Sequence, residues 1–230
     1  MRFGPEVALD KGELSSSVMR ARDNPFRSER ILQLRYRLEG ITWAELLKRC
    51  EALGGRAALV GPCGSGKTTL LEQLVPRFRE RGLATHFIRL NHETGAFEPG
   101  FISRLAARLT GRDVLLLDGA EQLSLARWHW FKWRTRRAGR LIITTHLPGR
   151  LPTLWECRTS TGLLRQLAAD LLQTDSGCDS ELAQDLFLKH RGNLREALRE
   201  CYDLAGSGQL KTHATRPNPR RDLAVPAVFC

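Results

Sequence analysis

The stretch that decides the fold of this chain is Gly61-Pro62-Cys63-Gly64-Ser65-Gly66-Lys67-Thr68. It matches the pattern G-x-x-x-x-G-K-[ST], in which glycines let successive main-chain N–H groups turn inward around an anion. A short apolar segment at 56–60 precedes it, and apolar residues at helical spacing follow over 68–81. Because the pattern lies between a strand and a helix, it favours a phosphate-binding loop over a chance glycine-rich turn.

This loop predicts a site for ATP with Mg²⁺. We expect the ammonium group of Lys67 to reach the β and γ phosphates and the hydroxyl of Thr68 to ligate Mg²⁺. The predicted nucleotide-binding residues are Gly61, Pro62, Cys63, Gly64, Ser65, Gly66, Lys67, Thr68 and Thr69.

A second motif follows a buried strand at 114–117, where every residue is Leu or Val. Asp118 ends this run, so its carboxylate is expected at the carboxyl edge of the sheet, where open α/β sheets bind ligands. We predict that Asp118 holds Mg²⁺ together with Thr68. The alternative is an aspartate that only caps the following turn.

Outward from these motifs, predicted strands alternate with predicted helices. Such alternation indicates an α/β fold, a P-loop NTPase three-layer sandwich with a five-stranded, mainly parallel sheet. Two helices, from Arg30 to Leu38 and from Trp43 to Cys50, are expected before the sheet. The expected strands are 56–60, 84–90, 114–117, 141–145 and 153–157, and the helices between them are 68–81, 101–109 and 123–137.

Beyond residue 161 the pattern is helical only, over 161–173, 179–190 and 193–204, which predicts a small C-terminal helical lid. The expected organisation is a flexible N-terminal arm (1–23), a P-loop ATPase core (24–158), the lid (159–205) and a disordered tail (206–230).

With these motifs in this order, the chain resembles an AAA+ ATPase of the additional-strand P-loop branch over about residues 25–205. The strand at 84–90, between the two motifs in the sequence, is part of that resemblance. The stretch Asp118-Gly119-Ala120-Glu121 and the compact lid also resemble the STAND signalling branch, and the small size resembles transposition and helicase-loading helpers. The resemblance implies ATP binding between core and lid, and a glutamate that activates water.

The chain departs from the family at Asp118-Gly119-Ala120-Glu121, where Gly119 stands at the position of the usual glutamate. Glu121 is the candidate general base that polarises the attacking water. The alternative is a first-turn glutamate favoured only by the helix dipole. Hydrolysis is therefore less firmly predicted than binding.

Two further motifs are similar to the AAA+ pattern, Thr144-Thr145-His146 after the fourth strand and Gly192-Asn193-Leu194-Arg195 in the lid. The resemblance implies that Thr145 and His146 sense the γ-phosphate and that Arg195 leans over the nucleotide. The alternatives are solvent-facing polar residues and a surface arginine on a helix capped by Asn193. The predicted catalytic residues are Lys67, Glu121, Thr145, His146 and Arg195; Arg140 or Arg150 is a candidate finger for a neighbouring subunit.

The partners are less sharply indicated. A formal charge of +11 favours polyanions such as nucleic acid, and the basic, tryptophan-rich segment 127–137 is either a nucleic-acid surface or a helix that packs Trp130 and Trp133 on the sheet. We favour packing. A protein partner or homo-oligomer is also expected. No apolar run approaches the roughly 18 residues of a membrane span, and the six cysteines lack zinc spacing, so we expect a cytoplasmic protein without a membrane partner.

Two functions from different classes follow. The first is an ATPase that couples ATP binding and hydrolysis to a conformational change on a macromolecular partner, with DNA as the candidate. The second is a nucleotide-gated regulatory switch with slow or no hydrolysis that acts through a protein partner. A small-molecule kinase is disfavoured, because nothing resembles a lid for an acceptor substrate.

Overall fold

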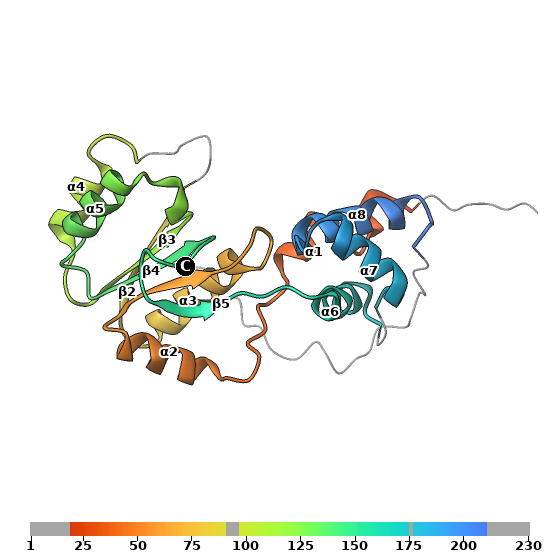
Figure 1. Cartoon of the computed structure of the whole chain (residues 1–230), viewed down its shortest axis with the longest axis horizontal. Helices are drawn as coiled ribbons and strands as arrows, with labels where there is room; N and C mark the ends of the chain where they lie inside the picture. Colours follow the sequence, from red (N-terminus) through yellow and green to blue (C-terminus); the bar gives the residue numbers. More distant parts are fainter. Residues whose placement is uncertain (1–18, 91–96, 175–176, 211–230) are drawn as a thin grey trace, which may run out of the picture.

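The computed structural model describes residues 19–90, 97–174 and 177–210 (Figure 1). Most of the predicted arm and tail, residues 1–18 and 211–230, lies outside the described residues. Five strands form one sheet in the order β2-β3-β4-β1-β5, and every strand pair is parallel. The strands are β1 (Arg56–Val60), β2 (Ala84–Arg89), β3 (Asp113–Asp118), β4 (Arg140–Thr145) and β5 (Thr153–Glu156).

Burial follows the position of each strand in the sheet. Every residue of β3 is buried, whereas the edge strand β2 buries only Ile88. A parallel strand covered on both faces must be apolar throughout, as the Val114–Leu117 run is. In the sheet, β4 lies between the loop-bearing strand β1 and the Asp118-bearing strand β3, while β2 takes the edge although it comes between them in the sequence.

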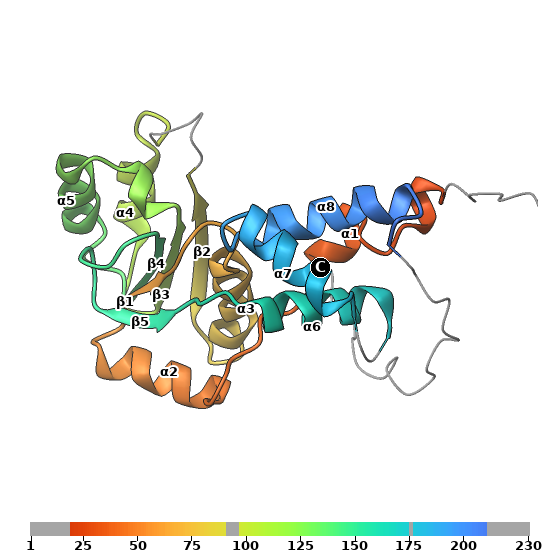
Figure 2. The ribbon, with the colours of Figure 1, turned by 45° about the vertical axis from the view of Figure 1, so that its right-hand side comes forward.

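Two helical layers cover the sheet. Alternate strand residues point to opposite faces, so Leu116 and Ile142 pack with α2 (Trp43–Ala52) and α3 (Lys67–Arg79). Leu117 and Ile143 pack with α4 (Phe101–Arg108) and α5 (Leu125–Arg134) on the other face (Figure 2). This is the P-loop three-layer sandwich that the sequence predicts.

The C-terminal helices form a separate apolar cluster beside the sheet (Figure 2). Their facing residues are apolar at helical spacing, and Phe26 from the N-terminal segment completes the cluster. The helices are α6 (Thr161–Leu172), α7 (Ser180–Lys189) and α8 (Leu194–Gly206). No helix within the described ranges is long and apolar enough to cross a membrane.

The helix predicted from Arg30 to Leu38 is wrong in extent, because α1 spans only Ser28–Leu32. After it the chain crosses from the C-terminal helices to the sheet. Ile31 and Leu34 pack against the cluster of the C-terminal helices, whereas Tyr36 and Leu38 pack against the cluster on the α2 and α3 face of the sheet. One face of a helix cannot pack against the C-terminal helices and against the sheet at the same time, so the chain is irregular here. A 3₁₀ turn, η1 (Ala21–Asp23), precedes α1.

The packing predicted for the tryptophan-rich helix is also wrong. Helix α5 turns Trp128 and Phe131 toward the sheet, at 3% and 0% exposure. Trp130 and Trp133 are 43% and 57% exposed. The buried stripe therefore runs along a different face of the helix from the one that the pair Trp130 and Trp133 suggested.

Candidate functional site

The glycine-rich loop joins the end of β1 to the start of α3, as the motif requires. Gly64 and Gly66 have φ of +71° and +83°, a left-handed conformation that side chains disfavour. A methyl group on Gly61 would overlap the carbonyl oxygen of Cys157 and lie 2.8 Å from Ser65 Oγ. Each of these three glycines therefore has its own steric reason.

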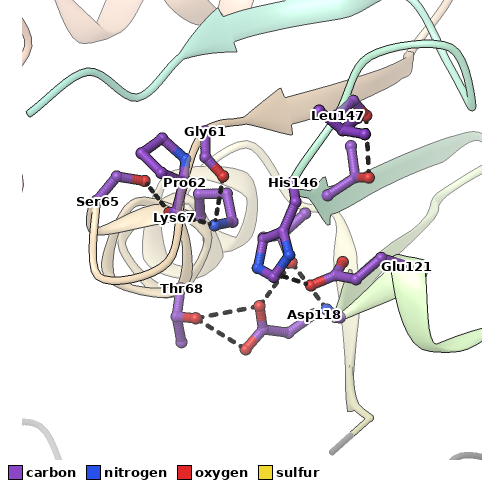
Figure 3. Close-up of polar contacts among 12 residues, drawn as sticks. Gly61, Pro62, Ser65, Lys67, Thr68, Asp118, Glu121, His146 and Leu147 are labelled. Atoms are coloured by element: carbon purple, nitrogen blue, oxygen red, sulfur yellow. Dashed lines mark hydrogen bonds and ion pairs between the residues drawn. The ribbon is translucent and has the colours of Figure 1, made fainter. Parts of the chain in front are cut away.

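Lys67 is the buried cation of the loop. Its side chain returns into the loop, where Nζ donates hydrogen bonds of 2.8 Å to the carbonyl oxygens of Gly61 and Pro62 (Figure 3). Burial lowers the pKa of Lys67 from its ordinary value, while the charge of Glu121 acts in the opposite direction. The ammonium group thus lies where an anion entering the loop would meet it.

Thr68 and Asp118 meet across the gap between α3 and β3. The Thr68 hydroxyl lies 3.1 and 3.0 Å from the two carboxylate oxygens of Asp118 (Figure 3). A hydroxyl beside a carboxylate at a phosphate loop is the oxygen donor set that Mg²⁺ takes in nucleotide sites. Within the described residues no three His, Cys, Asp or Glu side chains group as metal ligands.

Thr144 orients this carboxylate. Its hydroxyl donates to Asp118 Oδ1 at 2.7 Å and accepts from the main-chain N–H of Gly119 at 2.8 Å. Thr145, the residue named by the resemblance, donates instead to the carbonyl oxygen of Leu147 at 3.0 Å. Strand alternation explains the difference, because neighbouring residues of β4 face opposite sides of the sheet. The structure thus places Thr144, rather than Thr145, beside Asp118.

Arg89 is a neighbour of the site that the sequence did not reveal. Its Nε lies 3.4 Å from Asp118 Oδ2, and its Nη2 lies 2.6 Å from Glu72. Arg89 ends β2, and it pairs in register with Asp118 at the end of β3. Only the pairing of these two strands could have identified it, since the sequence alone does not state which strands are neighbours.

Glu121 and His146 are brought together by the turn at Gly119. Gly119 has φ of +84°, and a methyl group there would lie 2.6 Å from the carbonyl oxygen of Leu90. A glutamate side chain therefore cannot stand at position 119. The chain turns into a 3₁₀ segment, η2 (Ala120–Gln122), and carries Glu121 to within 3.2 Å of His146 Nε2 (Figure 3). The second carboxylate oxygen of Glu121 is buried and has no hydrogen-bond partner within the described part of the chain.

The start of α8 lies directly against the loop. Asn193 caps α8, accepting from the N–H of Glu196 at 3.3 Å, and the same Oδ1 atom would overlap a methyl group placed on Gly64. The cap predicted for Asn193 is thus present, and it is also a contact between α8 and the loop. Arg195 is exposed and lines the cavity at this junction.

A cavity of about 780 Å³ lies between the loop, the N-terminal segment, α6 and α8. Tyr36 lies beside Gly66 on one wall, and its hydroxyl accepts from Trp155 Nε1 at 3.0 Å. Burial raises the pKa of Tyr36. Sequence reasoning missed both aromatic residues, because neither belongs to a motif. The cavity is lined by, among others, Tyr36, Gly66, Thr68, Asp118, Trp155 and Arg195.

Both arginines considered as fingers contact their own chain. Arg140 forms a bidentate contact with Glu51 at the start of β4, the end of that strand away from the loop. Arg150 donates to the carbonyl oxygen of Leu123 at 2.6 Å and lies 5.5 Å from the ring centroid of Trp128. Neither side chain extends freely from the surface.

Comparison with known proteins gives structural neighbours only. No protein-family model matches the chain, and the curated proteins contain no match to it. Two RuvB mutants of Thermotoga maritima are 17% and 18% identical, with TM-scores of 0.46 and 0.48. They cover 72% and 76% of this chain, which spans 62% and 65% of theirs, less than two thirds.

Domain III of the Thermotoga maritima replication initiation protein DnaA is 13% identical, with a TM-score of 0.46. It covers 76% of this chain, which spans 87% of that domain. Identities and TM-scores this low do not assign the chain to a family. Function is therefore inferred from the geometry of the site.

Proposed function

We propose that this chain is an AAA+-type ATPase of the additional-strand branch that binds ATP with Mg²⁺ at the loop 61–68. The observation that carries the proposal is the convergence of Lys67, Thr68 and Asp118: a buried ammonium and a hydroxyl from the start of α3 meet a carboxylate from the end of β3 at one glycine-rich loop. The position of β4 between β1 and β3 supports the additional-strand assignment.

The roles follow from the chemistry of each group. Main-chain N–H groups of the loop and the ammonium group of Lys67 would hold the phosphates, and Thr68 and Asp118 would hold Mg²⁺. Bound Mg²⁺ would neutralise the negative charge that develops on the transferred phosphoryl group. Thr144 keeps the Asp118 carboxylate oriented, and the Gly119 N–H holds Thr144 in turn.

Glu121 is the proposed general base for hydrolysis. One carboxylate oxygen contacts His146, and the other has no partner in the described residues, so its capacity to accept a proton is unused. His146 is thus a positioning residue that sets the direction of Glu121. The products are ADP and phosphate.

The lid is proposed to report the nucleotide state. We propose a core at 24–158 and a lid at 159–205, with ATP between them and Arg195 facing it. Because Asn193 packs on Gly64, a phosphate that changes the loop also displaces the start of α8. Such a movement could be passed to a protein or nucleic-acid partner, or to a second copy of the chain. The STAND-like and helper-type assignments stay predictions.

Phosphate release tests the hydrolytic role. Wild type is expected to hydrolyse ATP, and the rate of phosphate release by Glu121→Gln is expected to be lower by about 100-fold or more, with unchanged affinity for the nucleotide. The matched control is Glu181→Gln on α7, which removes a charge remote from the loop. Equal turnover by wild type and Glu121→Gln would remove Glu121 from the mechanism.

The second candidate is a nucleotide-gated switch with slow or no hydrolysis. Gly119 favours it, because no carboxylate can follow Asp118 directly. Wild type that binds ATP in a titration but releases no phosphate, with or without DNA, would establish the switch and exclude the motor.

A further inference from the structure

Helix α5 presents a surface that the nucleotide site does not use. Trp130 and Trp133 are 43% and 57% exposed, and they lie three residues apart on one side of the helix. Figures 1 and 2 place α5 at the end of the core opposite the lid. Large exposed aromatic side chains are uncommon on a protein that has no partner for them, so this face needs an explanation.

The sequence around these rings carries charge of one sign. Residues 122–155 contain no Asp or Glu. Arg136 lies with its guanidinium carbon 5.0 Å from the Trp133 ring centroid, and Arg134 lies at 5.6 Å. Arg136 and Arg137 are both exposed. Flat aromatic faces and basic side chains thus occur together on α5 and in the turn that follows it.

We propose that this surface, formed by Trp130, Trp133, Arg134, Arg136 and Arg137, binds single-stranded nucleic acid. The two indoles stack on bases, and the arginines contact the backbone phosphates. Stacking platforms combined with basic side chains bind single strands with little sequence preference, because every base has an aromatic face. The charge selects a polyanion, and the exposed indole faces select one with free bases.

Other occupants fit less well. Duplex DNA keeps its bases stacked and inside, so exposed indoles gain little from it. A second copy of this chain would bring two basic faces together, which is repulsive. An acidic protein would satisfy the arginines but would leave the two indoles without flat partners.

The inner side of α5 contacts the segment that carries Glu121. Helix α5 is capped by Ser124, and Arg150 bridges Leu123 and Trp128. Strand binding could therefore change the position of Glu121 and raise turnover. This coupling rests on the proposed ATPase function, whereas the binding itself does not.

The test measures fluorescence anisotropy of a fluorescein-labelled oligothymidine with wild type and with the double variant Trp130→Ala and Trp133→Ala. Loss of one base–aromatic stack weakens binding by about tenfold, so the double variant should bind at least tenfold more weakly. Trp130→Phe with Trp133→Phe should keep most of the affinity. The control is Leu188→Ala on α7, an equally exposed apolar residue at 63%.

The salt dependence of binding, measured in arginine variants, separates the contribution of the arginines from that of the tryptophan rings. Arg136→Ala and Arg137→Ala should each reduce the slope of log affinity against log salt by about one, because each removes a phosphate contact. Circular dichroism is expected to show wild-type folding throughout, since the altered side chains are exposed.

Three results would overturn the proposal. The first is equal affinity of wild type and the double alanine variant for oligothymidine. The second is equal affinity of wild type for oligothymidine and for a duplex of the same length. The third is an oligomer in wild type that is lost in the double alanine variant, while both proteins bind oligothymidine equally. A parallel ATP titration keeps the two proposals apart. Wild type that binds oligothymidine through these tryptophans but binds no ATP would leave this surface established and the ATPase excluded.

Discussion

The hydroxyl of Thr68 lies within hydrogen-bond distance of both carboxylate oxygens of Asp118, at 3.1 and 3.0 Å, although the residues come from different elements of the core. If this pair holds Mg²⁺, Asp118→Asn should remove the metal dependence of ATP affinity. Wild type is expected to bind ATP about tenfold more tightly with Mg²⁺ than with a chelator. The variant should bind equally in both conditions, as measured by calorimetry.

The control for this variant is Asp203→Asn on α8, which removes an exposed carboxylate outside the site. Unchanged magnesium dependence in Asp118→Asn would exclude Asp118 as a ligand.

Thr144 and Thr145 provide a matched pair on one strand. Thr144→Val removes the bond to Asp118 and leaves the Gly119 N–H without its acceptor, so it should lower the free energy of unfolding by about 1–3 kcal/mol and weaken Mg-ATP binding several-fold. Thr145→Val removes one bond to Leu147 and should leave nucleotide affinity unchanged. Thermal denaturation and ATP titration measure both effects. If Thr145→Val weakened binding more than Thr144→Val, the orientation of β4 described above would be wrong.

Gly64 and Gly82 separate backbone strain from contact with the lid. Both have φ near +70°, but a methyl group on Gly64 meets Asn193, whereas one on Gly82 meets nothing within 4 Å. Each substitution by Ala should cost about 1–2 kcal/mol of unfolding free energy from the left-handed backbone alone. Only Gly64→Ala should also lower ATP affinity, because it forces the lid away from the loop. Equal nucleotide affinity in the two variants would mean that this contact is not part of the site.

The surroundings of Asp113 predict that the free energy of unfolding falls at acid pH. It accepts from His86 at 2.6 Å and from the N–H and hydroxyl of Thr110 at 2.7 and 2.6 Å. Burial acts to raise the pKa of Asp113, but these hydrogen bonds leave that pKa below its ordinary value. The contribution of ionised Asp113 to the free energy of unfolding is therefore complete above its pKa in the unfolded chain, about 3.9. It is lost as the pH falls through its lower pKa in the folded protein.

Asp113→Asn should flatten the dependence of unfolding free energy on pH below about pH 4, as followed by urea denaturation. The measurement of interest is the difference between the two pH profiles, because other carboxylates titrate in both proteins. Parallel profiles for wild type and variant would contradict a role for the ionised Asp113.

The sequence predicted the parts of the fold that local patterns encode. The apolar run Val114–Leu117 and the glycine-rich loop identify their strands and the position of Asp118, because burial on both faces and phosphate binding each leave a local signature. The helix cap at Asn193 could be predicted for the same reason, because a capping side chain before an apolar helical repeat is also a local signature.

The remaining features depend on contacts between distant segments. The choice between Thr144 and Thr145 needs the orientation of β4, and the role of Arg89 needs its register with β3. The exposed face of α5 follows from where the sheet and Phe97 lie, since Phe97 stacks on Phe131 at a centroid distance of 5.3 Å. Periodicity gives the helix but does not state which face its neighbours will cover.

Calorimetric titration of Mg-ATP into wild type and Lys67→Ala tests the central claim most directly. Lys48→Ala, an exposed lysine on α2, is the control. Wild type and Lys48→Ala should bind with the same affinity, and Lys67→Ala should show no measurable binding, because the loop loses its only side-chain cation. Undiminished ATP affinity in Lys67→Ala, or no binding by wild type, would contradict the assignment of residues 61–68 as a nucleotide site.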